Sequence, residues 1–143
     1  MNRFFDTSVL IQALVDQLPE HEQALAQYME GLQAPEKAFI SSHSIAECYA
    51  ILSALPLKRK ITPYEANQLV SESILGRVQV VELTKKDYQQ AMQKVLTANL
   101  GSGAIYDALH LVSAEKVSCT QIFTFNLKHF RPLAQNPASV LRP

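Results

Sequence analysis

The stretch FFDTSVLI, residues 4–11, places one carboxylate between two apolar runs near the start of the chain. Its aromatic residues favour a strand, whereas Val9, Leu10 and Ile11 resume the apolar pattern as the beginning of a helix. Asp6 therefore stands at the junction of a first strand and a first helix. Two roles suit a carboxylate in this position: it can cap the helix, or it can bind a metal ion at the end of the strand.

Short apolar runs alternate with longer amphipathic segments along the rest of the chain. Capping boxes predict that helices begin at TPYE, residues 62–65, and at TKKD, residues 84–87. The tail from Arg131 has three prolines, which is typical of an edge strand or a loose end. Strands separated by helices favour a three-layer α/β/α sandwich with a mostly parallel central sheet. The strands of that sheet are predicted over residues 3–5, 38–41, 78–82 and 121–125.

The composition is that of an ordinary globular protein. A chain of 143 residues fits one domain, which we expect to span residues 1–143. Its 13 basic and 13 acidic residues balance, so a nucleic acid would have to be held by a local cluster of cations. Cys48 and Cys119 lie too far apart for a zinc motif and are expected to be buried thiols. Because no apolar run is long enough to span a membrane, we expect a cytoplasmic protein.

Two further carboxylates occur in segments that share a pattern. In SIAECYAIL, residues 44–52, and AIYDALHLV, residues 104–112, Glu47 and Asp107 each follow an isoleucine by two residues. Two residues correspond to about 200° around a helix, so both acids leave their helices away from the apolar stripe. Taken singly, such acids are usually solvated side chains. They gain interest because parallel sheets bind ligands at the carboxyl ends of their strands, where Asp6 also lies.

Four motifs in order resemble a known family. These motifs are FFDTSVLI, SIAE, YDALHL and TFNLKHF, and together they resemble the PIN domain, specifically the VapC-like toxins of toxin-antitoxin pairs. The resemblance implies a metal-dependent ribonuclease that uses Mg²⁺ or Mn²⁺. The catalytic residues that it implies are Asp6, Glu47, Asp107 and Asn126, of which the three acids would bind the metal. It also implies a homodimer that is inhibited by a small antitoxin protein.

The fourth position departs from the most acidic form of the family motif. Asn126 stands where many relatives have Asp, so it offers a carbonyl oxygen without a charge. It can equally be a turn residue between a strand and a helix. Thr124, two residues earlier, could donate its hydroxyl to a carboxylate, or it could simply be a β-branched strand residue.

The implied chemistry explains why carboxylates are needed. An RNA phosphodiester is anionic, so acids can serve its hydrolysis only with a cation between them and the phosphate. Two carboxylates about 4 Å apart repel by roughly 4 kcal/mol at an effective dielectric constant near 20, which also calls for a bound cation. Mg²⁺ takes oxygen ligands and activates water. We therefore predict in-line attack by water, leaving 5′-phosphate and 3′-hydroxyl ends.

Two basic clusters could hold RNA phosphates. One is the run Lys58, Arg59 and Lys60, and the other follows Asn126 and consists of Lys128, His129 and Arg131. Solvated loop charges are the commoner role of such clusters. His110 lies one turn after Asp107 and could orient it, or it could be an ordinary polar residue of the helix.

Other functional classes fit the sequence less well. A phosphatase of the haloacid-dehalogenase type needs a second acid two residues after the first, where this chain has Ser8. A nucleotide-binding module needs a glycine-rich phosphate loop, and neither common form of that loop occurs. The main alternative is a PIN-like protein-interaction module with weak or no nuclease activity, because Asn126 lacks a charge.

Overall fold

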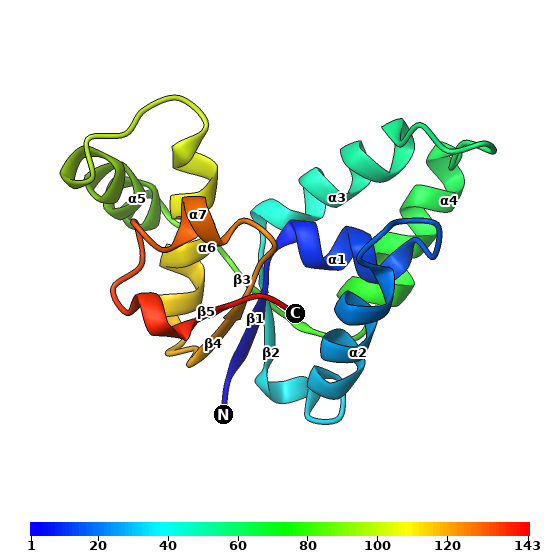
Figure 1. Ribbon diagram of the computed structural model, residues 1–143, viewed down its shortest axis with the longest axis horizontal. Coiled ribbons are helices and arrows are strands. Elements are labelled where there is room, and N and C mark those ends of the chain that lie inside the picture. The colour runs from blue at the N-terminus through cyan, green and yellow to red at the C-terminus, as the bar shows by residue number, and fades with distance from the viewer.

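A computed structural model describes residues 1–143 and contains one five-stranded sheet (Figure 1). All neighbouring strands are parallel, in the order β3-β2-β1-β4-β5. The predicted strands are confirmed, although the third and fourth are shorter than expected, and the tail supplies the edge strand β5. The strands are β1 (Arg3–Phe5), β2 (Ala38–Ser41), β3 (Gln79–Val81), β4 (Gln121–Phe123) and β5 (Val140–Leu141).

Helices cover both faces of the sheet, which confirms the three-layer α/β/α arrangement (Figure 1). Both capping boxes that the sequence predicted are present, at Thr62 and at Thr84. One face is covered by α1 (Thr7–Leu14), α2 (His21–Gly31), α3 (His43–Ala54), α4 (Pro63–Gln68) and its π-helical continuation η2 (Leu69–Leu75). The other face is covered by α5 (Lys85–Thr97), α6 (Ala104–Lys116) and α7 (Leu127–Phe130). The chain also forms two short 3₁₀ helices, η1 (Pro35–Lys37) and η3 (Pro137–Ser139).

The central strand β1 feeds a separate hydrophobic core on each face. Because successive strand side chains point to opposite faces, Phe5 packs into the core under α1 to α4, and Phe4 into the core under α5 to α7. Both rings are fully buried. Gly31 lets α2 approach closely, since a Cβ there would lie 2.6 Å from the Phe5 ring. The apolar run before Asp6 thus anchors the strand end from both sides.

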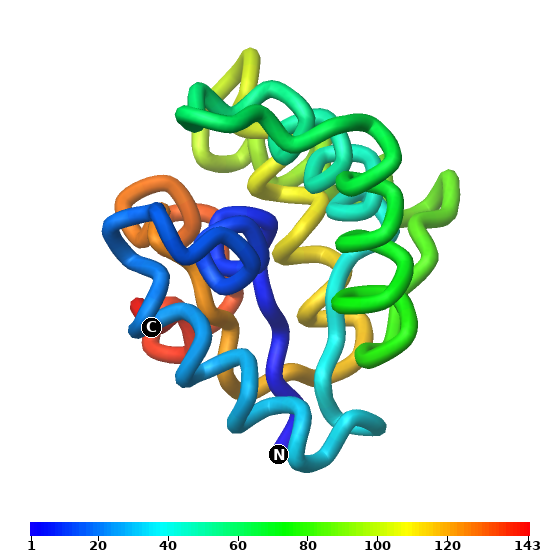
Figure 2. Tube along the Cα trace, turned by 90° about the vertical axis from the view of Figure 1, so that its right-hand side faces the viewer, coloured from blue at the N-terminus to red at the C-terminus, as the bar shows by residue number.

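The order of the strands reverses beside β1, and this reversal leaves a crevice position at the carboxyl ends of the strands. From β1 the chain continues through α1 and α2 to β2 on one side, whereas β4 and β5 lie on the other side. Figure 2 shows β1 and β2 rising side by side to the edge of the sheet where α1 and α3 begin. Parallel α/β sheets bind ligands at such a reversal. None of the helices has the length and apolar character needed to cross a membrane.

The second capping box is tied to α6 by an ion pair between the buried Asp87 and the exposed Lys116. Asp87 accepts hydrogen bonds from the Thr84 N–H (2.9 Å) and from Lys116 Nζ (2.9 Å). Burial acts to raise the pKa of Asp87, but the hydrogen bonds from Lys116 and Thr84 outweigh it, so the pKa is lowered. The folded state therefore favours the charged carboxylate.

We expect Asp87→Asn to lower the free energy of unfolding by about 1–2 kcal/mol at neutral pH. A lowered pKa stabilises the fold fully above the unfolded pKa, and this contribution is lost as the pH falls through the folded value. The difference from wild type should therefore shrink below about pH 4. Urea unfolding at several pH values measures it, with the exposed Asp16→Asn as control. A difference that stayed constant down to acidic pH would contradict a charge-based origin.

Candidate active site

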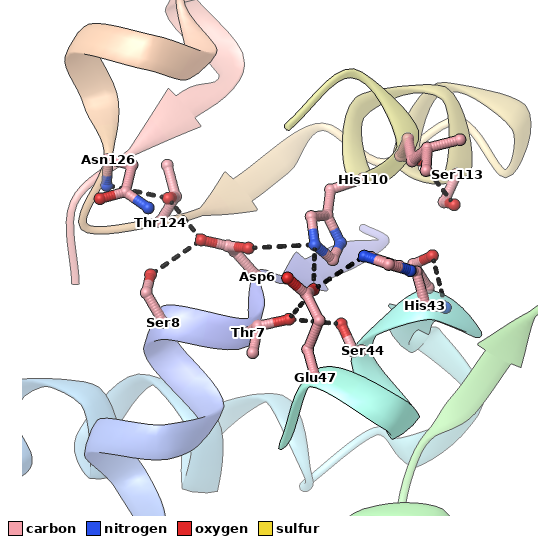
Figure 3. A network of polar contacts seen from close by, with 12 residues as sticks. Asp6, Thr7, Ser8, His43, Ser44, Glu47, His110, Ser113, Thr124 and Asn126 are labelled. Carbon is pink, nitrogen blue, oxygen red and sulfur yellow. Dashed lines mark hydrogen bonds and ion pairs between the residues drawn. The ribbon is translucent and has the colours of Figure 1, made fainter. Parts of the chain in front are cut away.

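Asp6 directs its carboxylate into a buried polar network at the strand ends (Figure 3). It is the N-cap residue of α1 by position, yet its side chain makes no capping hydrogen bond. Instead, Oδ2 accepts hydrogen bonds from Ser8 Oγ and Thr124 Oγ1, both at 2.8 Å. The geometry therefore excludes side-chain capping, which was one of the two roles predicted for Asp6.

Residues after β4 hold Asp6 in place. The Thr124 hydroxyl donates a hydrogen bond to Asp6, which is one of the two roles that the sequence predicted for Thr124. The same hydroxyl accepts a hydrogen bond from the Asn126 N–H at 2.9 Å. The Phe125 N–H donates to Ser8 Oγ at 3.2 Å. Asn126 itself is exposed, and it joins the network through its backbone. These contacts fix Oδ2 of Asp6 and leave Oδ1 facing His110.

Glu47 enters the same network from α3. His110 Nε2 lies 2.8 Å from Glu47 Oε1 and 3.6 Å from Asp6 Oδ1. Thr7 Oγ1 donates to Glu47 Oε1 at 2.8 Å, and His43 Nε2 lies 3.6 Å from the same oxygen. Since all these contacts converge on Oε1, none of them uses the second carboxylate oxygen of Glu47.

The His110 ring shapes the electrostatics of this network. Burial acts to raise the pKa of Glu47, but the hydrogen bond and charge of His110, together with Thr7, outweigh it and lower the pKa. Burial acts to lower the pKa of His110, but Glu47, Asp6 and Asp107 raise it. The charged forms of His110 and Glu47 therefore stabilise one another.

Asp107 has a different environment. Its half-buried carboxyl group has a raised pKa, first because of burial and second because of the Asp6 charge; no hydrogen bond contributes to the shift. The charges of His110 and His129 act in the opposite direction. The Asp6 charge therefore helps to disfavour the charged form of Asp107, which has no hydrogen bond that offsets this effect.

The side chains at the strand ends differ in how well they suit a divalent metal ion. No three His, Cys, Asp or Glu side chains converge closely enough to form a ready-made metal cluster. Asp6 and Asp107 nevertheless fit a hard cation, since both offer carboxylate oxygens and their mutual repulsion would be relieved by a positive charge. Mg²⁺ commonly uses one or two carboxylates and completes its shell with water.

The structure separates the two predicted basic clusters. Lys128 and His129 line a cavity of about 600 Å³ together with Asp107. Residues 58–60 instead lie in the loop at the outer end of α3, away from the strand ends, where Arg59 pairs with Glu65 (Figure 1). Only the cluster after Asn126 therefore adjoins the acids, and within it Arg131 donates to the Val140 carbonyl.

Sequence reasoning missed the central position of His110. The two predicted alternatives were that it orients Asp107 or is an ordinary polar residue of the helix; in the structure it is buried, and its Nε2 hydrogen-bonds Glu47. The available signal was its place in ALHLV, where a polar residue interrupts an apolar helical run. Thr7 and Ser44, which hydrogen-bond each other at 3.0 Å beside Glu47, carried no signal beyond their proximity to the acids.

Known proteins share this fold and sequence pattern. Residues 3–134 match the family model of the PIN domain. Ribonuclease VapC27 of Mycobacterium tuberculosis is 28% identical over 109 residues, which is 76% of this chain and 74% of that protein. Mycobacterium tuberculosis VapC20, described as a sarcin-ricin loop cleaving toxin, superposes with a TM-score of 0.72 at 16% identity, covering 90% of this chain and 92% of its own.

A second solved structure contains a bound complex. VapBC2 from Rickettsia felis, bound to a DNA fragment from its promoter, matches with a TM-score of 0.68 at 18% identity, covering 99% of this chain and 98% of its own. At these identities the solved structures support the fold. The family model covers nearly the whole chain and includes all four predicted site residues. The chain therefore belongs to the PIN domain family.

Proposed function

We propose that the protein is a metal-dependent endoribonuclease and the toxin of a toxin-antitoxin pair. The observation that carries the proposal is the position of Asp6 at the reversal of the strand order, where two hydroxyls fix its carboxylate and where its charge contributes to the raised pKa of Asp107. Asp6 follows β1, and Asp107 lies in the first turn of α6. The ribonuclease VapC27, which matches three quarters of the chain, supports the same activity.

The acids Asp6, Asp107 and Glu47 would hold Mg²⁺ or Mn²⁺, with Asn126 supplying a neutral oxygen at the rim. When bound, the ion polarises a phosphoryl oxygen and lowers the pKa of the attacking water. Asp6 presents Oδ1, because Oδ2 is taken up by Ser8 and Thr124. Glu47 presents Oε2, because His110 and Thr7 engage its other oxygen.

The remaining residues position the acids and the substrate. His110 holds Glu47 in one orientation and partly offsets the negative charge of the buried acids. Lys128 and His129, beside Asp107, would bind phosphates of the RNA strand. In-line attack by water then leaves 5′-phosphate and 3′-hydroxyl ends, and no side chain of the protein needs to act as a nucleophile.

The proposed partners are RNA, a small antitoxin and a second copy of the chain. Solved relatives include the VapBC2 and FitAB assemblies bound to DNA fragments. A toxin of this kind would act in the cytoplasm, where its RNA substrate lies. An antitoxin that covers the acids would inhibit it directly.

A PIN-like interaction module without cleavage is the second candidate. It is favoured by the uncharged, exposed Asn126 and by the contact of His110 with two of the acids. The two candidates differ in one measurable property, because only the enzyme produces new RNA ends.

An RNA cleavage assay with mapping of the product ends separates the candidates. We expect the purified wild-type protein to cleave single-stranded RNA with Mg²⁺ or Mn²⁺, to lose this activity in chelator, and to regain it when the metal is restored. The products should carry 5′-phosphate and 3′-hydroxyl ends. Cleavage that persisted in chelator, or products with 2′,3′-cyclic phosphates, would contradict the proposed mechanism.

Thr124 offers a graded test of how Asp6 is held. We expect Thr124→Val, which keeps the shape but removes the hydroxyl, to weaken Mg²⁺-dependent cleavage by about 10–100-fold, whereas Thr124→Ser retains most of it. Mg²⁺ titration of the cleavage rate measures the effect, and it should appear mainly as a higher Mg²⁺ requirement. Equal activity of the Val and Ser variants would show that this hydrogen bond is dispensable.

A further inference from the structure

A stacked aromatic pair stands beside the acids, and one of its two rings, Tyr106, has no role in the network described above. The Tyr106 and His43 rings are nearly parallel, with an interplanar angle of 8° and centroids 5.2 Å apart. His43 begins α3 one turn before Glu47, and Tyr106 directly precedes Asp107 on α6. The pair therefore joins the two helices that carry these acids.

The outer ring of the pair is open to solvent. Tyr106 is 52% exposed, although residues 108–114 of the same helix are buried. His43 covers one face of the Tyr106 ring and is itself held at 3.6 Å from Glu47 Oε1 and 5.7 Å from the His110 ring. An exposed aromatic ring is thus backed by a second ring, and this contact restricts its motion and lowers the entropy lost when a ligand stacks on it.

The cations lie at another part of the same site. Lys128 and His129 line the cavity next to Asp107 and follow Asn126 in the chain. Figure 3 shows Asn126 and His43 at opposite ends of the network, with Asp6 and Glu47 between them. His43 of the aromatic pair therefore lies at one end of Asp6 and Glu47, and Asn126, which precedes Lys128 and His129 in the chain, lies at the other.

We propose that the free face of Tyr106 stacks on a nucleobase next to the scissile phosphate of a single-stranded RNA. This inference rests on the proposed ribonuclease function and assigns a substrate-binding residue to it. Every base has a π face, so stacking accepts many sequences, and it requires the unpaired bases that a single strand provides. The platform would thus set the position of the strand over the acids, while Lys128 and His129 hold its backbone.

Substitutions at Tyr106 test the platform. The first probe is a pool of short single-stranded RNAs with a randomised interior. The RNA of that pool that wild type cleaves best is then used as the single substrate for kinetics. We expect Tyr106→Leu and Tyr106→Ala to raise KM by about 5- to 100-fold with a smaller change in kcat, and Tyr106→Phe to resemble wild type. Tyr88→Ala, which removes a similarly exposed tyrosine from α5, should leave KM unchanged.

An abasic scan of the same RNA locates the stacked base. One abasic nucleotide next to the cleaved bond should raise KM for wild type, whereas Tyr106→Leu should be insensitive to it because the stacking partner is already missing. Wild-type KM in Tyr106→Leu, or equal sensitivity of both proteins at every position, would overturn the platform. Absence of metal-dependent cleavage by wild type would instead overturn the proposed function, and with it the platform.

Discussion

Asp6→Asn is expected to reduce metal-dependent RNA cleavage by at least about 100-fold while leaving the protein folded. The asparagine keeps the size of the side chain and can still accept hydrogen bonds from Ser8 and Thr124 through its amide oxygen. It loses the negative charge that a divalent ion requires, and it turns an amide group toward His110. The change therefore removes the chemistry with little effect on packing.

The measurement is the initial cleavage rate over a range of Mg²⁺ concentrations, with circular dichroism and thermal unfolding as checks of the fold. Asp16→Asn is the matched control, because it makes the same substitution at an exposed position away from the strand ends. We expect the control to retain full activity. An Asp6→Asn protein that cleaved RNA like wild type would rule out Asp6 as a metal ligand.

His110→Leu is expected to cause the largest loss of stability among substitutions in the site. Leucine has a similar volume, so packing between Phe4 and Phe130 is largely kept. The only hydrogen bond lost is that between Nε2 and Glu47, since the buried Nδ1 has no partner. Glu47 and Asp6 then lose the positive group that lies against both of them. We expect the free energy of unfolding to fall by about 2 kcal/mol, because Glu47 keeps some contact with water.

Urea unfolding in chelator measures this loss, and a second substitution identifies its cause. Adding Glu47→Gln to His110→Leu should recover part of the stability, because the unpaired carboxylate is then neutralised. His129→Leu, at an exposed position, should change stability by less than about 0.5 kcal/mol. Unchanged stability in His110→Leu, or losses that simply add in the double variant, would contradict a stabilising pair of His110 and Glu47.

The layered fold could be predicted from local patterns because each element carries its own signal. The aromatic run before Asp6 alternates between two faces and fixes β1 as a strand that is buried on both sides. The capping boxes at Thr62 and Thr84 mark helix starts with side chains only three residues apart. Such short-range signals do not depend on tertiary contacts. By contrast, the short length of β3 and β4 depends on how far their neighbours pair with them.

The acids could be predicted, but their partners could not. Asp6, Glu47 and Asp107 stood out because a charge is unusual beside an apolar run. The role of His110 depends on a contact of α6 with α3, and no spacing within α6 encodes it. For the same reason, simple repulsion between carboxylates predicts a raised pKa for Glu47, whereas His110 helps to lower it; the pKa of Asp107 is raised.

The most direct test of a shared metal site is the position of Mn²⁺ in a crystal of the protein, located by its anomalous scattering. We expect one strong peak within coordination distance of both Asp6 and Asp107, on the side of Asp6 Oδ1, and loss of that peak in Asp6→Asn. The assignment would be contradicted if Mn²⁺ bound only at another place in the protein. It would also be contradicted if Mn²⁺ bound through only one of these two carboxylates and the peak was retained in Asp6→Asn.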